Sequence, residues 1–187
     1  MKLFAKHGVS GTTLAEIGMA AGYSRGLPIY AFGSKDKFLI AMLRSMEVWF
    51  EQLAHEQLGG KTGLEAFRTR LKTHFIGLRK DPVAVAALFS IFSHSFFGDA
   101  ALKVEVDHVV EQWRRGFSRH LKEAYQAGQI KKVDFDKHAA ICVALIRGVN
   151  MEYLLSGSKL DLDSLRNSIL DFFDHSLQPT EVRFKRT

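Results

Sequence analysis

The chain has 187 residues, of which 47% are hydrophobic and 25% are charged, as in an ordinary globular protein. Its one cysteine, Cys142, excludes an internal disulfide framework. The sequence has neither a run of about 18 apolar residues nor a signal-peptide pattern, so we expect a cytoplasmic protein that does not span a membrane.

The net charge of +6 is unevenly distributed. The first 45 residues hold six Lys or Arg against Glu16 and Asp36, whereas the rest of the chain is almost neutral. A small basic module is expected where a protein contacts the phosphate backbone of a nucleic acid. A solvated surface explains the charge alone equally well.

The apolar residues have helical spacing nearly throughout and no alternating strand pattern occurs, so we predict an all-α fold. Near the start, Thr13 and Glu16 have the spacing of a capping box, and Gly22 stands where that helix must stop. Ser24 can cap a second short helix and Ser34 a long third one. Two short helices joined by a tight turn and followed by a long helix are the layout of a helix-turn-helix DNA-binding motif.

Further helices are predicted from the residues that start and stop helices in the remaining chain. Gly59-Gly60 ends the long helix, and Asp81-Pro82 marks a stop followed by a new start, with Asp81 as the cap. Residues 83–97 are apolar almost all round, which predicts a buried central helix. Gly98-Asp99 opens another long helix that ends near Gly128. The last two helices are expected at about 136–155 and 163–177.

The second short helix, over Ser24 to Tyr30, is the candidate reading helix, because the N-terminal residues of such a helix reach base edges in the major groove. Arg25 suits phosphate or guanine, Leu27 a thymine methyl group and Tyr30 a phosphate, and Gly26 permits close backbone approach. Threonines at the start of the preceding helix offer donors to a phosphate. The alternative is a helical hairpin with no nucleic-acid role. The predicted DNA-binding residues are Thr12, Thr13, Ser24, Arg25, Gly26, Leu27, Tyr30 and Lys35.

Residues 3–43 carry the frame Leu-Phe … Gly … Thr-Thr … Glu-Ile … Ala-Gly-x-Ser-x-Gly … Tyr-x-Phe-x-Ser-Lys. This frame resembles the DNA-binding region of the TetR family of bacterial transcriptional regulators, and the helix pattern of the remaining chain is similar to the family's ligand-sensing, dimerising domain. The resemblance implies a homodimer, an operator in double-stranded DNA, and a small molecule whose binding releases the DNA. It also places further residues before Leu3-Phe4, so we expect the first helix to be truncated. Ile29 and Tyr30 stand where many members carry Tyr and His, so the resemblance implies no operator sequence.

Aromatic residues are abundant, with fifteen phenylalanines and two tryptophans. Core filling is the simplest explanation. The sharper hypothesis is that some of these side chains line an apolar cavity with few polar groups, which predicts a small hydrophobic effector. The predicted ligand-binding residues are Phe75, Phe89, Phe92, His94, Phe96, Trp113 and Phe117.

The last two predicted helices carry broad apolar faces, which two subunits could join into a four-helix bundle, with Gly148 allowing close approach. The alternative is that these faces only close the core of one subunit. The predicted dimer-interface residues are Val143, Ile146, Tyr153, Leu165, Ile169, Phe172 and Phe173.

An enzyme is the least favoured class. Residues 22–26 satisfy the Gly-x-Ser-x-Gly pattern of hydrolases, but that motif requires a preceding β-strand. The histidines form no metal-ligand pattern. We therefore predict no catalytic residues, no metal site and no cofactor.

Our hypothesis is an all-α, ligand-responsive transcriptional regulator, most simply a repressor, that binds a palindromic operator as a homodimer. The DNA-binding domain is expected at residues 1–45, and the ligand-binding and dimerisation domain at 46–187. The alternative hypothesis is a dimeric small-molecule-binding protein with a vestigial DNA reader.

Overall fold

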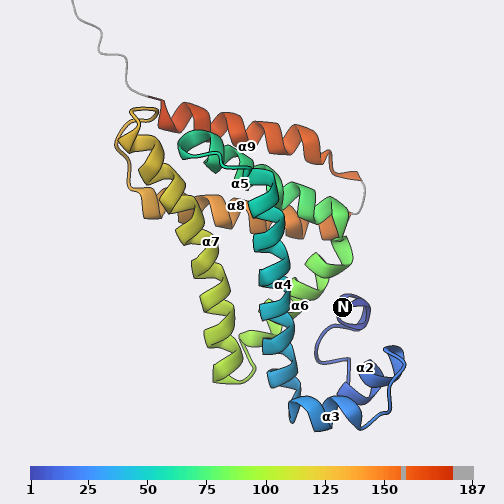
Figure 1. The fold of residues 1–187 in the computed structure, drawn as a ribbon. Helices are drawn as coiled ribbons and strands as arrows, with labels where there is room; N and C mark the ends of the chain where they lie inside the picture. The colour runs from blue at the N-terminus through green and yellow to red at the C-terminus, as the bar shows by residue number, and fades with distance from the viewer. Residues whose placement is uncertain (157–158, 179–187) are drawn as a thin grey trace, which may run out of the picture. The chain divides into compact units, whose positions relative to one another are not determined.

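The computed structural model describes residues 1–156 and 159–178. Within these ranges the chain is built from α-helices and contains no strand (Figure 1). The helices are α1 (Lys2–His7), α2 (Leu14–Ala20), α3 (Leu27–Phe32), α4 (Lys35–Leu58), α5 (Gly63–Lys80), α6 (Pro82–Ser95), α7 (Ala100–Gln126), α8 (Phe135–Ser156) and α9 (Leu162–Leu177). The all-α fold predicted from the helical spacing is confirmed.

Three helices begin with the predicted caps. Thr13 and Glu16 form the capping box of α2, and Ser34 Oγ accepts a hydrogen bond from the Lys37 amide at 3.2 Å. The Asp81 carboxylate accepts one from the Ala84 amide at 2.8 Å, with proline in the first turn of α6. These bonds satisfy amides that have no partner inside their own helix.

The reading helix begins at Leu27 and not next to Ser24, which is the delayed first turn that Pro28 predicts. Ser24 does not cap it, because α3 starts at Leu27 and has no side-chain cap bond. Pro28 explains the shift, since a residue without an N–H and with a fixed φ suits the first turn of a helix. A Cβ on Gly18 would lie 2.7 Å from the Ser24 carbonyl oxygen and 3.0 Å from the Pro28 ring. The close packing of α2 on α3 therefore depends on glycine at position 18.

The described helices gather into two compact units. Unit 1 comprises Met1–Leu53 with Ile76–Gln112, and unit 2 comprises Ala54–Phe75 with Trp113–Thr187. The long helices α4, α5 and α7 each contribute to both units. The chain has no break at residue 45, because α4 runs through this position. The division of function between 1–45 and 46–187 stays a prediction.

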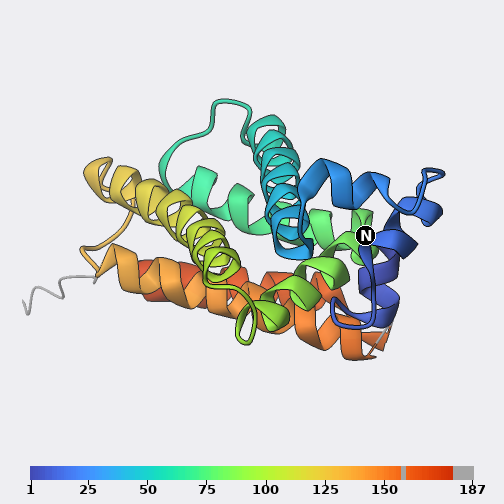
Figure 2. The same cartoon turned by 90° about the horizontal axis from the view of Figure 1, so that it is seen from below.

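In unit 1, α1 packs against α6 and α2 against α3 (Figure 2). Its core side chains, such as Phe4, Leu39 and Ile91, are at most 2% exposed. Helix α6 was expected to be buried all round, but only one side of it is buried. Phe96 and Phe97, which follow its last residue, are largely exposed. An apolar composition thus overstated the burial of this segment, because apolar atoms also make up much of a protein's surface.

Aromatic rings fill the core of unit 2. The Phe67 ring meets the rings of Phe117 and Phe173 edge-on, with centroids 5.5 and 5.3 Å away. All three side chains are at most 1% exposed. Helix α8 also belongs to this unit. It has the length and composition of a membrane span, a property that core helices share, and one side of it is buried.

Candidate functional site

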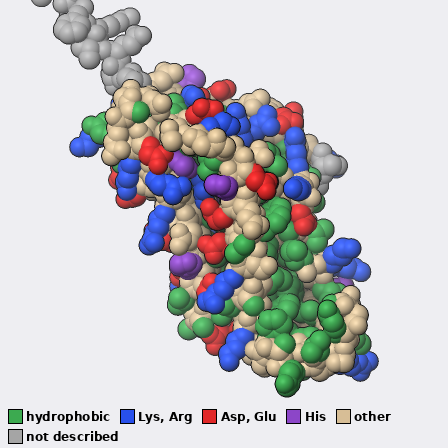
Figure 3. All heavy atoms as spheres, viewed as in Figure 1, with side chains coloured by type: hydrophobic (Ala, Val, Ile, Leu, Met, Phe, Trp, Pro, Cys, Tyr) green, Lys and Arg blue, Asp and Glu red, His purple; other side chains and the backbone are tan. Residues whose placement is uncertain are grey.

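The surface of α3 presents large side chains to solvent. Tyr30 is 90% exposed and Leu27 40%, and Tyr23, in the turn before the helix, is 62% exposed. Pro28 is buried on the other side of the helix. Figure 3 shows hydrophobic side chains gathered over this part of unit 1. A short helix anchored on one side and exposed on the other can enter a groove without disturbing the core of its own unit.

Arg25 lies in the exposed turn that precedes α3. Its Nε–H donates to the Met19 sulfur at 3.2 Å. A guanidinium has five N–H donors, so this bond orients the side chain and leaves donors for a phosphate or a guanine. Ser24 and Gly26 are exposed in the same turn.

Thr12 does not face solvent as predicted. The side chain is 1% exposed, and its hydroxyl donates to the carbonyl oxygens of Gly8 at 2.9 Å and Leu3 at 3.4 Å. The phosphate contact predicted for Thr12 is therefore corrected to a bond inside the loop between α1 and α2. A threonine beside the capping residue carries no sequence signal for which way its hydroxyl turns.

The start of α2 already holds an anion. The Thr13 amide and hydroxyl donate to the Glu16 carboxylate at 2.7 and 2.8 Å. These bonds, the backbone one above all, hold the pKa of Glu16 below its usual range. The carboxylate is thus charged at neutral pH and occupies the helix N-terminus that was expected to receive a phosphate.

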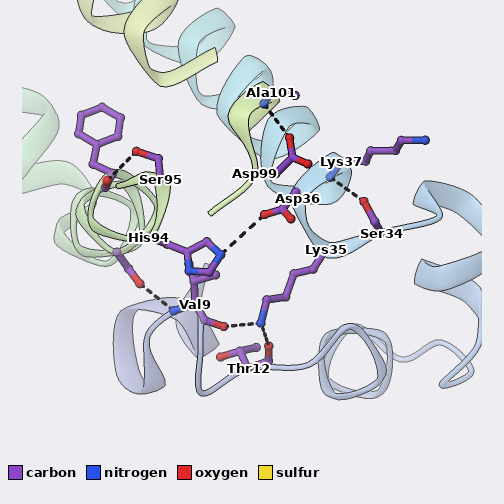
Figure 4. A network of polar contacts seen from close by, with 12 residues as sticks. Val9, Thr12, Ser34, Lys35, Asp36, Lys37, His94, Ser95, Asp99 and Ala101 are labelled. Carbon is purple, nitrogen blue, oxygen red and sulfur yellow. Dashed lines mark hydrogen bonds and ion pairs between the residues drawn. The ribbon is translucent and has the colours of Figure 1, made fainter. Parts of the chain in front are cut away.

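Lys35 also makes bonds within unit 1 (Figure 4). Its ammonium donates to the carbonyl oxygens of Val9 at 2.7 Å and Thr12 at 2.9 Å. On the other side of the loop, the Val9 amide donates to Ser90 Oγ at 2.9 Å. The loop that leads into α2 is therefore held by α4 and by α6. Sequence reasoning missed Ser90, because a single serine on an apolar helix forms no motif.

His94, predicted to bind the ligand, points toward the first turn of α4 (Figure 4). Its Nε2 lies 3.7 Å from Asp36 Oδ1. This carboxylate oxygen is buried and has no hydrogen-bond partner in the described part of the chain. The structure thus brings His94 together with a residue for which no role was predicted.

The other predicted ligand-binding residues are divided between the two units. Phe89 and Phe92 lie in unit 1, with ring centroids 6.2 Å apart. Phe96 also lies there and is 68% exposed. Phe75, Trp113 and Phe117 lie in unit 2 and are buried.

In unit 2, Trp113 and Phe117 flank a histidine that sequence reasoning missed. The His74 ring stacks on Phe117 at 5.7 Å and meets Trp113 edge-on at 5.5 Å. Burial, with a smaller effect of the Arg70 charge, lowers the pKa of His74 to about 3. The Arg70 guanidinium is close to Gly116, where an added Cβ would lie 2.6 Å from Arg70 Cζ. The sequence signal that could have identified His74 is its position one turn after Arg70 on α5.

Four of the predicted interface residues are buried inside unit 2 itself. Val143, Ile146, Ile169 and Phe173 are between 1% and 7% exposed, so they close the core of one subunit. This corrects their predicted role, because a buried side chain has little surface left for a partner. Of the other three, Phe172 is 55% exposed, and Tyr153 and Leu165 are half-buried.

An exposed stripe on α8 was missed apart from Gly148. Ile141, Gly148, Met151 and Leu155 are exposed, as is the small Ala144 between them, and the spacings along the helix are three and four residues. Leu155 is 74% exposed. This spacing forms the seam of packed helices and could have been found in the sequence.

Two family models match the chain. The model described as bacterial regulatory proteins, tetR family, matches residues 1–42. The model described as the tetracyclin repressor-like C-terminal domain matches residues 98–169. Together the two models match more than half of the chain. No curated protein sequence matches it.

Several solved structures share the fold. A proposed transcriptional regulator from Saccharomonospora viridis, in complex with choline, is 19% identical, with 96% of this chain and 93% of that chain covered and a TM-score of 0.82. The transcriptional regulator FadR from Bacillus subtilis, in complex with stearoyl-CoA, is 19% identical, with 94% of each chain covered and a TM-score of 0.80. A proposed TetR-family transcriptional regulator from Rhodococcus sp. is 19% identical, with 95% and 93% covered and a TM-score of 0.78.

The helix-turn-helix arrangement of α2 and α3, the helical body that follows it and the two matching family models lead to one assignment. The chain belongs to the TetR family of bacterial transcriptional regulators.

Proposed function

We propose that this protein is a ligand-responsive repressor that binds a palindromic operator as a homodimer in the cytoplasm and is released by a small hydrophobic molecule. The observation that carries the proposal is the exposed surface of α3. Leu27 and Tyr30 are free of the core of unit 1, and Arg25 is held beside them by Met19.

The proposed contacts with DNA lie in and before α3. Arg25 supplies donors to a phosphate or a guanine, Leu27 contacts a thymine methyl group and Tyr30 reaches a phosphate. The small residues Ser24 and Gly26 allow the exposed turn to come close to the DNA backbone. In a dimer, two copies of α3 about 34–36 Å apart would read half-sites one turn of the duplex apart.

The exposed stripe on α8 supports a homodimer. Apolar residues at alternating spacings of three and four, together with Phe172 on α9, suit a bundle of two helices from each subunit. We expect Phe172→Glu and Met151→Glu to give monomers in size-exclusion chromatography with light scattering, because a charge would be buried in the seam. Glu152→Lys, an exposed neighbour outside the stripe, is the matched control. A dimer that persists in both apolar variants would place the interface elsewhere.

The effector is proposed to be apolar because buried aromatic side chains dominate the predicted ligand-binding residues. The ligands in two of the similar structures, stearoyl-CoA and choline, are chemically different molecules and so do not select one for this chain. A differential affinity of about 1–3 kcal/mol between two conformers is sufficient for a moderate response. Binding of the effector near Trp113 is tested by fluorescence. An apolar ligand should quench the wild type more than the Trp113→Phe variant.

The decisive experiment measures fluorescence anisotropy of a labelled duplex from the region upstream of the protein's own gene, at two salt concentrations. We expect tight binding that weakens steeply with salt, because neutralised phosphates release counterions. Arg25→Ala should weaken binding and lower the salt slope by about one if it contacts a phosphate. Arg119→Ala removes an exposed guanidinium from α7 in unit 2 and should not change the affinity. Absence of specific binding by the wild type would instead favour a dimeric small-molecule-binding protein with a vestigial DNA reader.

A further inference from the structure

Two polar side chains, one turn apart on α6, face the helix-turn-helix region of unit 1. Ser90 Oγ accepts the hydrogen bond from the Val9 amide at 2.9 Å, and His94 Nε2 lies 3.7 Å from Asp36 Oδ1. Asp36 directly follows Lys35, whose ammonium donates to the Val9 carbonyl oxygen at 2.7 Å (Figure 4). Helix α6 therefore meets both the loop before α2 and the start of α4.

The contact between His94 and Asp36 is incomplete. A separation of 3.7 Å is too long for a hydrogen bond, although it is short enough for attraction between opposite charges. Asp36 Oδ1 is buried and accepts no hydrogen bond from the described residues. A buried acceptor without a donor is destabilising, so a small approach of a charged imidazole would satisfy this oxygen.

We propose that His94 is a proton-operated latch between α6 and α4. When the imidazole is protonated, it pairs with Asp36 and holds the end of α6 against the start of α4, which fixes the loop before α2 and the presentation of α3. Loss of the proton releases the latch. The inference rests on the proposed function, because it makes DNA affinity depend on pH.

Two general properties support this assignment. Histidine is the side chain that ordinarily changes charge between pH 5 and 8. His94 also lies in the last turn of α6, where the partial negative charge of the helix C-terminus favours a cation.

Two other charged groups in this region are bonded to backbone groups and not to His94. The Lys35 ammonium is bonded to the carbonyl oxygens of Val9 and Thr12. Asp99, in the turn after α6, accepts from the Ala101 amide at 2.6 Å. The exposed titratable groups of unit 1 include Lys2, Lys6 and His7 on α1, Lys37 and Arg44 on α4, and Lys103 and Asp107 on α7. Among the described residues, Asp36 is the carboxylate at ion-pair distance from His94, so protonation of His94 strengthens this contact.

A double-mutant cycle on the full chain tests the latch without DNA. The free energy of unfolding in urea is measured for the wild type, His94→Gln, Asp36→Asn and the double variant, at about pH 5.5 and about pH 8, on either side of the range in which histidine titrates. We expect a coupling of about two- to fivefold in the unfolding equilibrium at the lower pH and none at the higher pH. His108→Gln, an exposed histidine on α7 of the same unit, should show no coupling to Asp36→Asn. Equal coupling at both pH values, or none at either, would overturn the latch.

Fluorescence anisotropy with the upstream duplex then tests whether the latch changes DNA affinity. We expect the wild type to lose about two- to fivefold in affinity between the lower and the higher pH relative to His94→Gln. If the cycle shows coupling but the two proteins have the same pH dependence of DNA binding, the latch does not control DNA reading. If no protein binds DNA at either pH, the proposed function fails, and the unfolding cycle alone decides whether the latch exists.

Discussion

The clearest contacts inside unit 1 and inside unit 2 differ in kind. In unit 1, polar side chains join helices to one another, as when the Arg44 guanidinium on α4 makes two bonds of 2.9 and 2.8 Å to Glu105 on α7. In unit 2, buried rings pack edge-on around Phe67, and a partly exposed ion pair of 2.9 Å joins Arg68 on α5 to Asp174 on α9. Polar contacts can exchange partners at small cost, whereas interlocked rings have one good arrangement. The polar bonds of unit 1 should therefore exchange more easily than the ring packing around Phe67.

The largest expected effect is the loss of a ring from unit 2. Phe67→Ala should lower the free energy of unfolding by about 3–5 kcal/mol, because the ring is fully buried between two others and its removal leaves a cavity. Urea denaturation measures this loss. Phe172→Ala, whose ring is 55% exposed, should cost much less. Similar losses in the two variants would mean that the rings of unit 2 do not form a tightly packed core.

Acid should weaken unit 2 through His74. Its pKa is about 3 in the folded protein and near 6.5 in an unfolded chain, so only the unfolded state binds the proton between these values. The neutral histidine therefore contributes stability above about pH 6.5, which is lost at up to about 1.4 kcal/mol per pH unit as the pH falls toward 3.

His74→Gln tests this assignment by removing the titrating group. Its free energy of unfolding, measured in urea from about pH 7 to about pH 4.5, should fall less steeply than that of the wild type. His55→Gln changes an exposed histidine of the same unit and should keep the wild-type slope. An unchanged slope in His74→Gln would mean that other groups cause the acid sensitivity.

In unit 1, Lys35 should act as a structural joint. Lys35→Met keeps most of the aliphatic chain but removes the donors to the Val9 and Thr12 carbonyl oxygens, and we expect a loss of about 1.5 kcal/mol. Hydrogen exchange should also become faster in the loop before α2. Lys37→Met, at an exposed position in the same turn, should leave both unchanged. Weaker DNA binding at full stability would return Lys35 to the role of a phosphate ligand.

Most helix positions could be predicted because helix ends depend on local chemistry. The capping box at Thr13 and Glu16 and the Asp81-Pro82 start need only residues within one turn of each other. The Ser24 cap of α3 was wrong because two local signals competed there. Ser24 suited a cap, but the requirement of Pro28 for a first-turn position prevailed.

The roles of individual side chains were harder to predict because they depend on which turn faces a neighbouring element. Adjacent threonines have opposite environments, since Thr12 is buried and Thr13 is exposed. On α8, the residues chosen for their apolar character, such as Val143 and Ile146, proved to fill the core, and the exposed residues between them remain for a partner. The helical period gives two apolar faces here, and the sequence alone does not say which is buried.

The smallest expected effect in unit 1 is the loss of the capping box at the start of α2. Thr13→Ala removes the hydroxyl that accepts the Glu16 amide and donates to its carboxylate, which should cost about 1 kcal/mol of unfolding free energy. Ser10→Ala, an exposed residue of the preceding loop, is the matched control and should be neutral. DNA affinity separates two explanations of this capping box. If Glu16 serves only to cap α2, the loss of DNA affinity in Thr13→Ala should not exceed the loss of unfolding free energy. If the carboxylate also keeps phosphate away from α2, Glu16→Gln should bind the upstream duplex more tightly than the wild type and with a steeper dependence on salt.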